Sequence, residues 1–257
     1  MSESFLEFET FGSYADLTHA RPRRTLEFAG VSARQEALVG IVKLYSARAC
    51  PFAHRTRLVL SHKNIGFEVE EIDLKNKPAW FDRDVSAYGK VPAIAHDDLR
   101  LWESAVINEY LDETFPRPPL LPAQPGRRAL ARIWIDYANT RFAPAFGTLL
   151  RAKEPEAQAS ARKELAEVLQ EIEERALAKL SAAGPFFFGS TPSLVDFSFY
   201  PWFERWAALE RFRDFPAPAD LKRLERFRQA SRELEAVRAH ENPADYYIAR
   251  YAAVLGS

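Results

Sequence analysis

Cys50 is the only cysteine in the 257-residue chain, and it stands between a β-rich run and a helical one (residues 52–60) whose apolar side chains share one face. Pro51 suits the first turn of that helix, where a missing N–H costs nothing. The free N–H groups and the dipole of a helix N-terminus stabilise a thiolate, the nucleophilic form of cysteine. We expect Arg48 and His54 to add positive potential. The competing interpretation is an ordinary buried cysteine, packed as a small apolar residue.

Residues 50–53 occupy the place of a C-x-x-C motif, but Ala53 stands where the second cysteine would be. A dithiol mechanism needs a resolving thiol in the same chain, and this chain has none. A monothiol mechanism takes its second thiol from solution, and glutathione is the abundant cytosolic candidate. A chain with one cysteine forms no internal disulfide, which indicates a reducing compartment. We therefore expect monothiol chemistry with glutathione as cosubstrate, in the cytoplasm.

Three further positions could hold the backbone and the charged ends of a peptide ligand. Val91-Pro92 opens a predicted strand, where a cis bond would leave the Val91 main chain free to pair with a peptide, although trans is the commoner state. Glu103 and Ser104 open a predicted helix, and such N-termini bind carboxylates, although a plain helix cap is the simpler interpretation. Lys77 is either a ligand contact or a solvated lysine.

Composition and spacing argue against several other functions. Lys and Arg number 35 and Asp and Glu 36, so the net charge of −1 disfavours a nucleic-acid partner. No apolar stretch approaches the roughly 18 residues of a membrane helix, which argues against stable membrane association. The five histidines lack metal-site spacing, apart from the weak pair His54 and His62, so we expect no metal. No dinucleotide-binding, phosphate-binding or hydrolase-elbow motif stands out.

The predicted elements run strand, helix, strand, helix, strand, strand, helix, followed by a proline-rich segment and then by helices alone. This order predicts an α/β domain joined to an all-α domain. The predicted limits are an N-terminal extension at 1–40, an α/β domain at 41–116, a linker at 117–126 and a helical domain at 127–257. Ser193 and Asp196 form a capping box that should open one apolar helix running to about Glu210.

Taken together, these residues resemble the omega class of the glutathione transferase superfamily. The likeness runs from about residue 41 to about residue 240 and rests on five segments in the family's order: residues 50–60, 74–81, 89–93, 102–107 and 196–205. It implies a thioredoxin-like N-terminal domain that binds glutathione, joined to a helical domain that binds the second substrate. The N-terminal extension is longer than is usual in the family.

The resemblance implies that Cys50 forms a mixed disulfide with glutathione. A further set of residues would bind that glutathione: Phe52, Lys77, Val91, Pro92, Glu103 and Ser104. Within this set, Lys77 would contact the glycine carboxylate, Val91 would pair with the cysteinyl backbone beside a cis Pro92, and the last two would hold the γ-glutamyl end. Four aromatic residues would line the substrate pocket: Phe142, Phe146, Trp202 and Trp206.

The family's activities are the glutathione-dependent reduction of disulfides and of dehydroascorbate, and the reductive cleavage of glutathione conjugates. The resemblance therefore implies a small hydrophobic or disulfide substrate, and a homodimer. Two alternatives stay open. One is a non-enzymatic glutathione-binding or chloride-intracellular-channel-like protein, since that family shares the fold and the C-P-F motif. The other is a glutathione lyase that cleaves aromatic thioethers, which differs only in its substrate.

Overall fold

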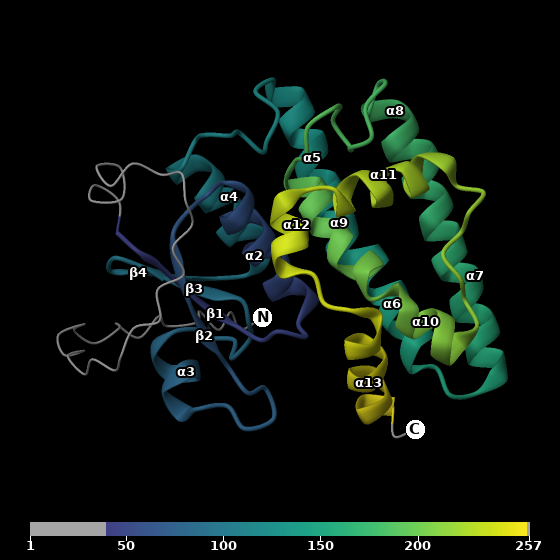
Figure 1. Cartoon of the computed structure of the whole chain (residues 1–257), viewed down its shortest axis with the longest axis horizontal. Coiled ribbons are helices and arrows are strands. Elements are labelled where there is room, and N and C mark those ends of the chain that lie inside the picture. The colour runs from purple at the N-terminus through teal and green to yellow at the C-terminus, as the bar shows by residue number, and fades with distance from the viewer. Residues whose placement is uncertain (1–39, 256–257) are drawn as a thin grey trace, which may run out of the picture.

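The computed structural model describes residues 40–255, so residues 1–39 of the predicted N-terminal extension lie outside the described part of the chain. The elements, in chain order, are β1 (Val42–Ser46), α2 (Pro51–His62), β2 (Phe67–Glu71), α3 (Ala79–Asp84), β3 (Ala93–His96), β4 (Leu99–Trp102), α4 (Ser104–Thr114), α5 (Pro125–Tyr137), η1 (Ala138–Phe142), α6 (Ala143–Arg151), α7 (Pro155–Glu171), η2 (Ile172–Leu177), α8 (Ala178–Leu180), α9 (Leu194–Glu204), α10 (Trp206–Arg213), α11 (Lys222–Arg232), α12 (Glu235–His240) and α13 (Ala244–Leu255). The elements η1 and η2 are π-helical turns. A small α/β domain thus precedes a helical domain, which confirms the predicted fold class (Figure 1). Within residues 40–255, no helix combines the length and the apolar character needed to cross a membrane.

The sheet of the N-terminal domain has four strands in the order β2-β1-β3-β4. The first pair is parallel, and β3 is antiparallel to both β1 and β4. Because side chains alternate across a strand, Leu44 and Ile94 pack with the core that includes α2 and α4, whereas Tyr45 and Ala93 pack toward α3. The pairing directions bring the end of β1, the start of β3 and the end of β4 to one edge of the sheet, where the predicted glutathione-binding segments lie.

Helix α2 is buried on every side, rather than on one face as its sequence pattern predicts. Every residue from 53 to 60 is buried, because the helix contacts α4, α9 and α12 as well as lying against the sheet (Figure 1). Helical spacing separates a buried face from an exposed one only where solvent lies opposite the core. Arg55 and Arg57, which the pattern would leave in solvent, are therefore inside the protein.

The capping box formed by Ser193 and Asp196 is present, but the prediction of one helix running to about Glu210 is wrong. The run is interrupted at Arg205, whose φ of −87° and ψ of 1° separate α9 from α10. Pro201 lies inside α9 and has no N–H to donate to the preceding turn. The Nη1 atom of Arg205 donates to the carbonyl of Pro201 at 2.5 Å. The change of direction therefore occurs where the arginine side chain turns back on the helix end.

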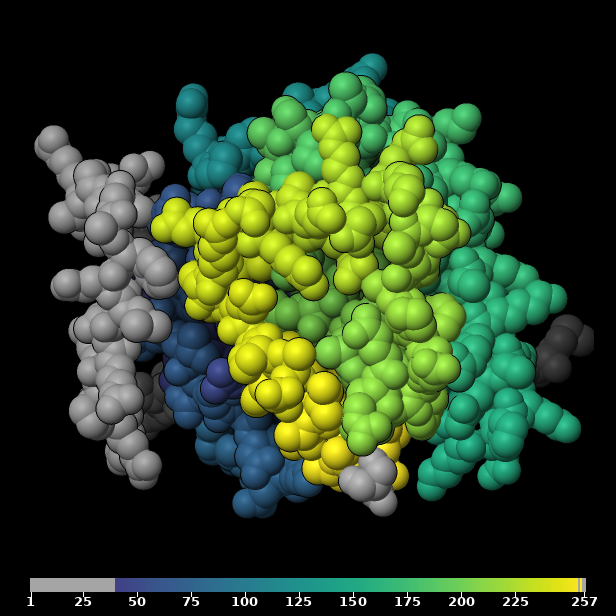
Figure 2. All heavy atoms as spheres, turned by 45° about the vertical axis from the view of Figure 1, so that its right-hand side comes forward, coloured from purple at the N-terminus to yellow at the C-terminus, as the bar shows by residue number. Residues whose placement is uncertain are grey.

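The C-terminal helices cover the junction between the two domains. Figure 2 shows this yellow segment lying across the boundary between the blue N-terminal domain and the green helical domain. Helix α12 contacts α2, and α13 contacts α10. Arg48 Nε donates to Asn242 Oδ1 at 2.6 Å, and the hydroxyl of Tyr247 donates to the carboxylate of Glu204. The segment is therefore anchored to both domains close to the loop that carries Cys50.

Candidate active site

Cys50 is the N-cap residue of α2, at the end of the loop that follows β1. Its backbone is extended, and its N–H donates to the Ala47 carbonyl at 2.8 Å, which fixes the turn. The thiol is free and half-buried, and it donates to the Val91 carbonyl at 3.7 Å. The first N–H groups of α2 have no acceptor within the helix and face its N-terminal end. The structure thus places the chain's one sulfur nucleophile between a helix N-terminus and the main chain of Val91.

The segment before β3 presents an extended main chain beside that thiol. The Val91–Pro92 peptide bond is cis, as the resemblance implies. Val91 lies ahead of the ladder pairs of β3, which begin at Ala93. Its main chain is therefore outside the sheet ladder and suited to pair with an extended peptide.

Lys77 lies at the rim of the same segment. Its Nζ atom donates to the Gly89 carbonyl at 2.9 Å and pairs with the carboxylate of Asp82 at 3.1 Å. Gly89 has a φ of +58°, and a Cβ added there would lie 2.5 Å from Nζ, so glycine permits this close approach. The Lys77 side chain is 31% exposed and remains accessible to a ligand from solvent.

Glu103 and Ser104 form the N-terminus of α4 at the same edge of the sheet. Glu103 has a φ of 69° and a ψ of 111°, a conformation that non-glycine residues rarely adopt and that often marks a functional site. Ser104 is the first residue of the helix and is buried, and its Oγ lies 3.4 Å from Nη1 of Arg55. The first N–H groups of such a helix are free to bind a carboxylate. The structure therefore brings all the residues predicted to bind glutathione to one region around Cys50.

Comparison with known proteins gives matches in both domains. The family model of the glutathione S-transferase N-terminal domain matches residues 49–114, and that of the C-terminal domain matches residues 155–230. The chain is 39% identical to glutathione S-transferase omega-1 of Sus scrofa over 173 residues, which are 66% of this chain and 69% of that protein. The chain belongs to the omega class of the glutathione S-transferase family. It is therefore a glutathione transferase, an enzyme that uses glutathione.

The fold is also similar to that of solved glutathione transferases and of a dehydroascorbate reductase. Glutathione transferase Omega 3C of Trametes versicolor is 27% identical, with a TM-score of 0.73 over 84% of this chain and 92% of that one. The dehydroascorbate reductase of Chlamydomonas reinhardtii is 25% identical, with a TM-score of 0.69 over 83% of this chain and 98% of that one. Both likenesses extend over the two domains.

Arg55 lies beside Ser104, one of the residues predicted to bind glutathione, and the sequence pattern did not single it out. Its guanidinium is fully buried, donates from Nε to the Ser198 carbonyl at 2.9 Å, and donates from Nη1 to Asn139 Oδ1 at 2.5 Å. Burial lowers the pKa of Arg55 to about 9, so the group remains charged at neutral pH. Its spacing could have pointed to it, because Arg55 follows Phe52 by three residues. The two residues therefore share a helix face, and Phe52 is a predicted ligand contact.

Of the two predicted sources of positive potential, His54 is wrong, whereas the contribution of Arg48 stays a prediction. His54 is fully buried, and burial together with the neighbouring Arg205 holds its pKa well below the usual range, so the ring is neutral. Arg48 is engaged by Asn242 and lies 4.9 Å from the ring centre of Tyr246. The charge of a Cys50 thiolate opposes the burial that lowers the pKa of Arg55 and of Arg57, so both lie within its electrostatic reach.

The four predicted pocket aromatics lie in three different surroundings. Trp202 packs edge-on against Phe52 at 5.1 Å between ring centres, which brings it to the region of Cys50. Phe142 and Phe146 are buried in the helical core, where Phe142 stacks on Phe203 and Phe146 meets the edge of Trp206. That they line a substrate pocket stays a prediction.

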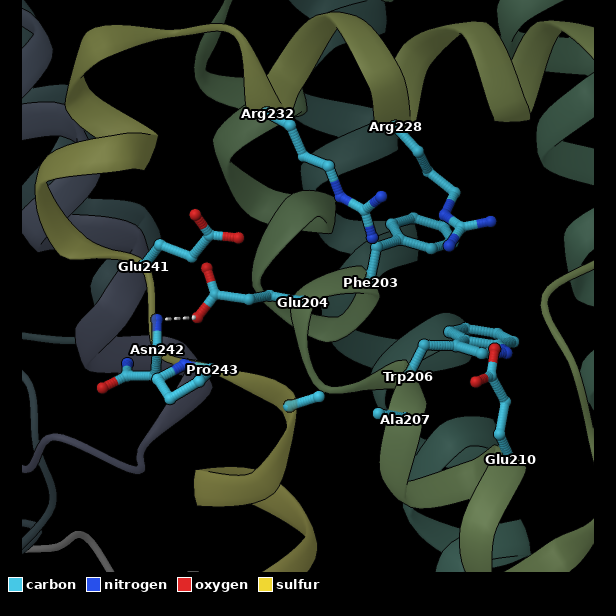
Figure 3. Close-up of a pocket in the computed structure, with 11 residues that line it drawn as sticks. Phe203, Glu204, Trp206, Ala207, Glu210, Arg228, Arg232, Glu241, Asn242 and Pro243 are labelled. Carbon is cyan, nitrogen blue, oxygen red and sulfur yellow. Dashed lines mark hydrogen bonds between the residues drawn. The ribbon is translucent and has the colours of Figure 1, made fainter.

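Trp206 borders a different cavity, of about 250 Å³, between α9, α10, α11 and the chain leading into α13 (Figure 3). Figure 3 shows Glu204, Arg232 and Glu241 around it, with the ring of Phe203 beneath the two arginines of α11. None of the residues predicted to bind glutathione lines this cavity. It is therefore separate from the space around Cys50.

Proposed function

We propose that this chain is a glutathione-dependent thiol transferase or reductase that acts through Cys50. The observation that carries the proposal is the placement of the chain's single cysteine at the N-terminus of α2, with its thiol 3.7 Å from the Val91 carbonyl. A helix N-terminus favours thiolate, and a lone thiol requires an external one to complete turnover. The likeness to a structure described as a dehydroascorbate reductase supports a reductive activity.

In this proposal glutathione lies extended from Lys77 to Ser104. Lys77 meets its glycine carboxylate, and the main chain of Val91, beside Pro92, pairs with its cysteinyl backbone. Glu103 takes the α-ammonium of the γ-glutamyl end. The Ser104 hydroxyl and the N-terminal N–H groups of α4 take its α-carboxylate. Phe52 borders the tripeptide from the first turn of α2.

The reaction proceeds in two thiol–disulfide exchanges. The Cys50 thiolate attacks the glutathione sulfur of a mixed disulfide, the old S–S bond breaks, and the substrate sulfur leaves as a thiolate that takes a proton from water. Cys50 is then joined to glutathione. The thiolate of a second glutathione attacks the glutathione sulfur of this adduct, so that glutathione disulfide leaves and the Cys50 thiolate returns.

The second substrate is a small hydrophobic molecule or disulfide that enters beside Phe52 and Trp202. The edge-on contact between these rings supports this placement, because it joins the first turn of α2 to the helical domain. Phe142, Phe146 and Trp206 would shape the pocket from behind. Dehydroascorbate and glutathione thioethers are the further substrates that the same thiolate could serve.

We also propose a homodimer in a reducing, cytoplasmic compartment. Val106 on α4 and Ile133 on α5 are large apolar residues that are 55% and 59% exposed, which supports an interface over these helices. Light scattering coupled to size exclusion should give twice the chain mass for the wild type. The Ile133→Glu variant should shift it toward the monomer, and a monomeric wild type would rule the dimer out.

The decisive experiment measures glutathione-dependent reduction of a small mixed disulfide by the wild type and by Cys50→Ser. Turnover should disappear in the variant while glutathione still binds. Mass spectrometry of the wild type after exposure to glutathione disulfide should find one glutathionyl group, on Cys50. Binding of glutathione without turnover in the wild type would reject the reductase and favour a lyase or a binding protein.

A further inference from the structure

The guanidinium of Arg55 carries a buried positive charge that no carboxylate of the described chain balances. Among residues 40–255, no Asp or Glu oxygen lies within 4.0 Å of it. Its protein partners are neutral: the Ser198 carbonyl, Asn139 Oδ1 and Ser104 Oγ. Buried charges are normally paired, because an uncompensated one is costly.

Arg57, two residues along the same helix, provides the contrast. It is also buried, but its Nη1 lies 4.0 Å from the carboxylate of Glu71, and it donates to Ser46 Oγ at 2.5 Å and to the Arg48 carbonyl at 3.0 Å. Arg55 by comparison retains one nitrogen, Nη2, that is inaccessible to water and donates to no described protein atom. Its hydrogen-bonding capacity is therefore incompletely used.

The guanidinium also has a fixed position. Its central carbon lies 4.5 Å from the ring centre of Trp202 and 4.9 Å from that of Phe52. Contacts with aromatic faces stabilise a guanidinium and exclude water from it. A charge held in such an environment acts on a nearby anion much more strongly than one in bulk water.

We propose that Arg55 is the residue that makes the site selective for the α-carboxylate of the γ-glutamyl group. This rests on the proposed function, in which that carboxylate binds at Ser104 and the N-terminus of α4. A carboxylate bonded to the Ser104 hydroxyl is next to the guanidinium, since Arg55 Nη1 lies 3.4 Å from Ser104 Oγ. The ligand then supplies the carboxylate that no Asp or Glu of the described protein places within 4.0 Å of this guanidinium. Asn139 and Ser198, both on the helical domain, hold the cation in place.

The test compares two ligands by calorimetry on the full chain. One is glutathione, and the other is an analogue in which 4-aminobutanoyl replaces γ-glutamyl, so that only the α-carboxylate is missing. The wild type should prefer glutathione by about 30-fold, a value typical of a charge-assisted hydrogen bond. Arg55→Met should bind the analogue as the wild type does but lose most of the preference. Arg57→Met, the matched control, should retain it.

A second variant avoids removing the buried side chain. Asn139→Asp is nearly isosteric and places a carboxylate on Arg55 Nη1, so the cation is balanced inside the protein. Glutathione affinity should fall about tenfold, as expected for the loss of one charged contact, while affinity for the analogue stays the same. If Arg55→Met and Asn139→Asp weaken both ligands equally, Arg55 has a structural role only and the proposal is wrong. A wild type that binds glutathione and its analogue equally would refute it too, whereas one that binds neither would reject the proposed function itself.

Discussion

The region around Cys50 and the core of the helical domain are built in opposite ways. Around Cys50 the chain leaves regular structure, with a cis bond before Pro92 and a positive φ at Glu103, and it buries the charged group of Arg55. In the helical core, by contrast, aromatic rings such as Phe142 and Phe203 stack on one another and are buried. In the proposed function, the first region binds the ligand and the second holds the first in place.

Because of this difference, substitutions in the two regions should change different measured quantities. Substitutions near Cys50 remove groups that act on a ligand or on a reacting atom, so their cost should appear in binding and turnover. Substitutions in the aromatic core leave cavities, so their cost should appear in the free energy of unfolding. Each substitution below tests whether effects on activity and effects on stability are in fact separate.

The largest expected effect on activity is that of Cys50→Ser. Turnover of a mixed disulfide should fall on the order of 10³-fold or more, because serine does not form the sulfur adduct. The free energy of unfolding should change by less than about 1 kcal/mol, since the thiol is half-buried and makes one weak hydrogen bond. Urea denaturation beside the activity assay measures both quantities. A large loss of stability would show that this cysteine is a packing residue.

The largest expected effect on stability is that of Phe142→Ala. The ring is fully buried and packs on Phe199, Trp202 and Phe203, so its removal should cost about 3–5 kcal/mol. Measured below its melting temperature, the folded variant should bind glutathione nearly as the wild type does. Phe142→Leu is the matched control and should lose much less stability. If Phe142→Ala lost glutathione affinity but retained its stability, the two regions would have to be treated as one binding site.

Sequence reasoning was most successful where local chemistry determines the structure. The capping box at Ser193 and the strand-to-helix turn at Cys50 depend on neighbouring residues, and both are present. It was least successful where tertiary packing decides. Helical spacing could not reveal that α2 is surrounded, so the burial of Arg55 and the neutrality of His54 had no sequence signature of their own. Asn139, some 84 residues from its partner Arg55, is found only from the fold.

The junction between the two regions should make the protein sensitive to acid. Burial, together with the charge of Arg57, lowers the pKa of His240 to about 4, and its ring lies 6.3 Å from that of Phe67 in β2. The unfolded chain takes up this proton near pH 6.5, whereas the folded one resists it until about pH 4. Stability is therefore fully present above pH 6.5 and declines as the pH falls toward 4.

The change can be measured by urea denaturation of the wild type and of His240→Gln at pH 8 and pH 5. Between these values the wild type should lose about 1–2 kcal/mol more than the variant, after allowance for the partial exposure of the ring. At pH 8 the histidine is neutral in both the folded and the unfolded state, so this arm controls for packing changes. Equal losses in the two proteins would remove His240 as the source of the acid sensitivity.

The smallest expected effect is at the rim of the proposed glutathione site, where Lys77 is partly exposed and already paired with Asp82. A rim charge screened by solvent contributes about 1 kcal/mol or less, so Lys77→Met should raise the dissociation constant for glutathione about three- to fivefold. The loss should shrink as salt is added, because the charge is accessible to ions. Lys75→Met, on the same loop, is the matched control and should leave the constant unchanged. Equal effects of the two variants would show that Lys77 acts only through the general positive charge of the loop. An effect that does not change with salt would show instead that the ligand desolvates the Lys77 ammonium, so that this residue belongs with the buried region.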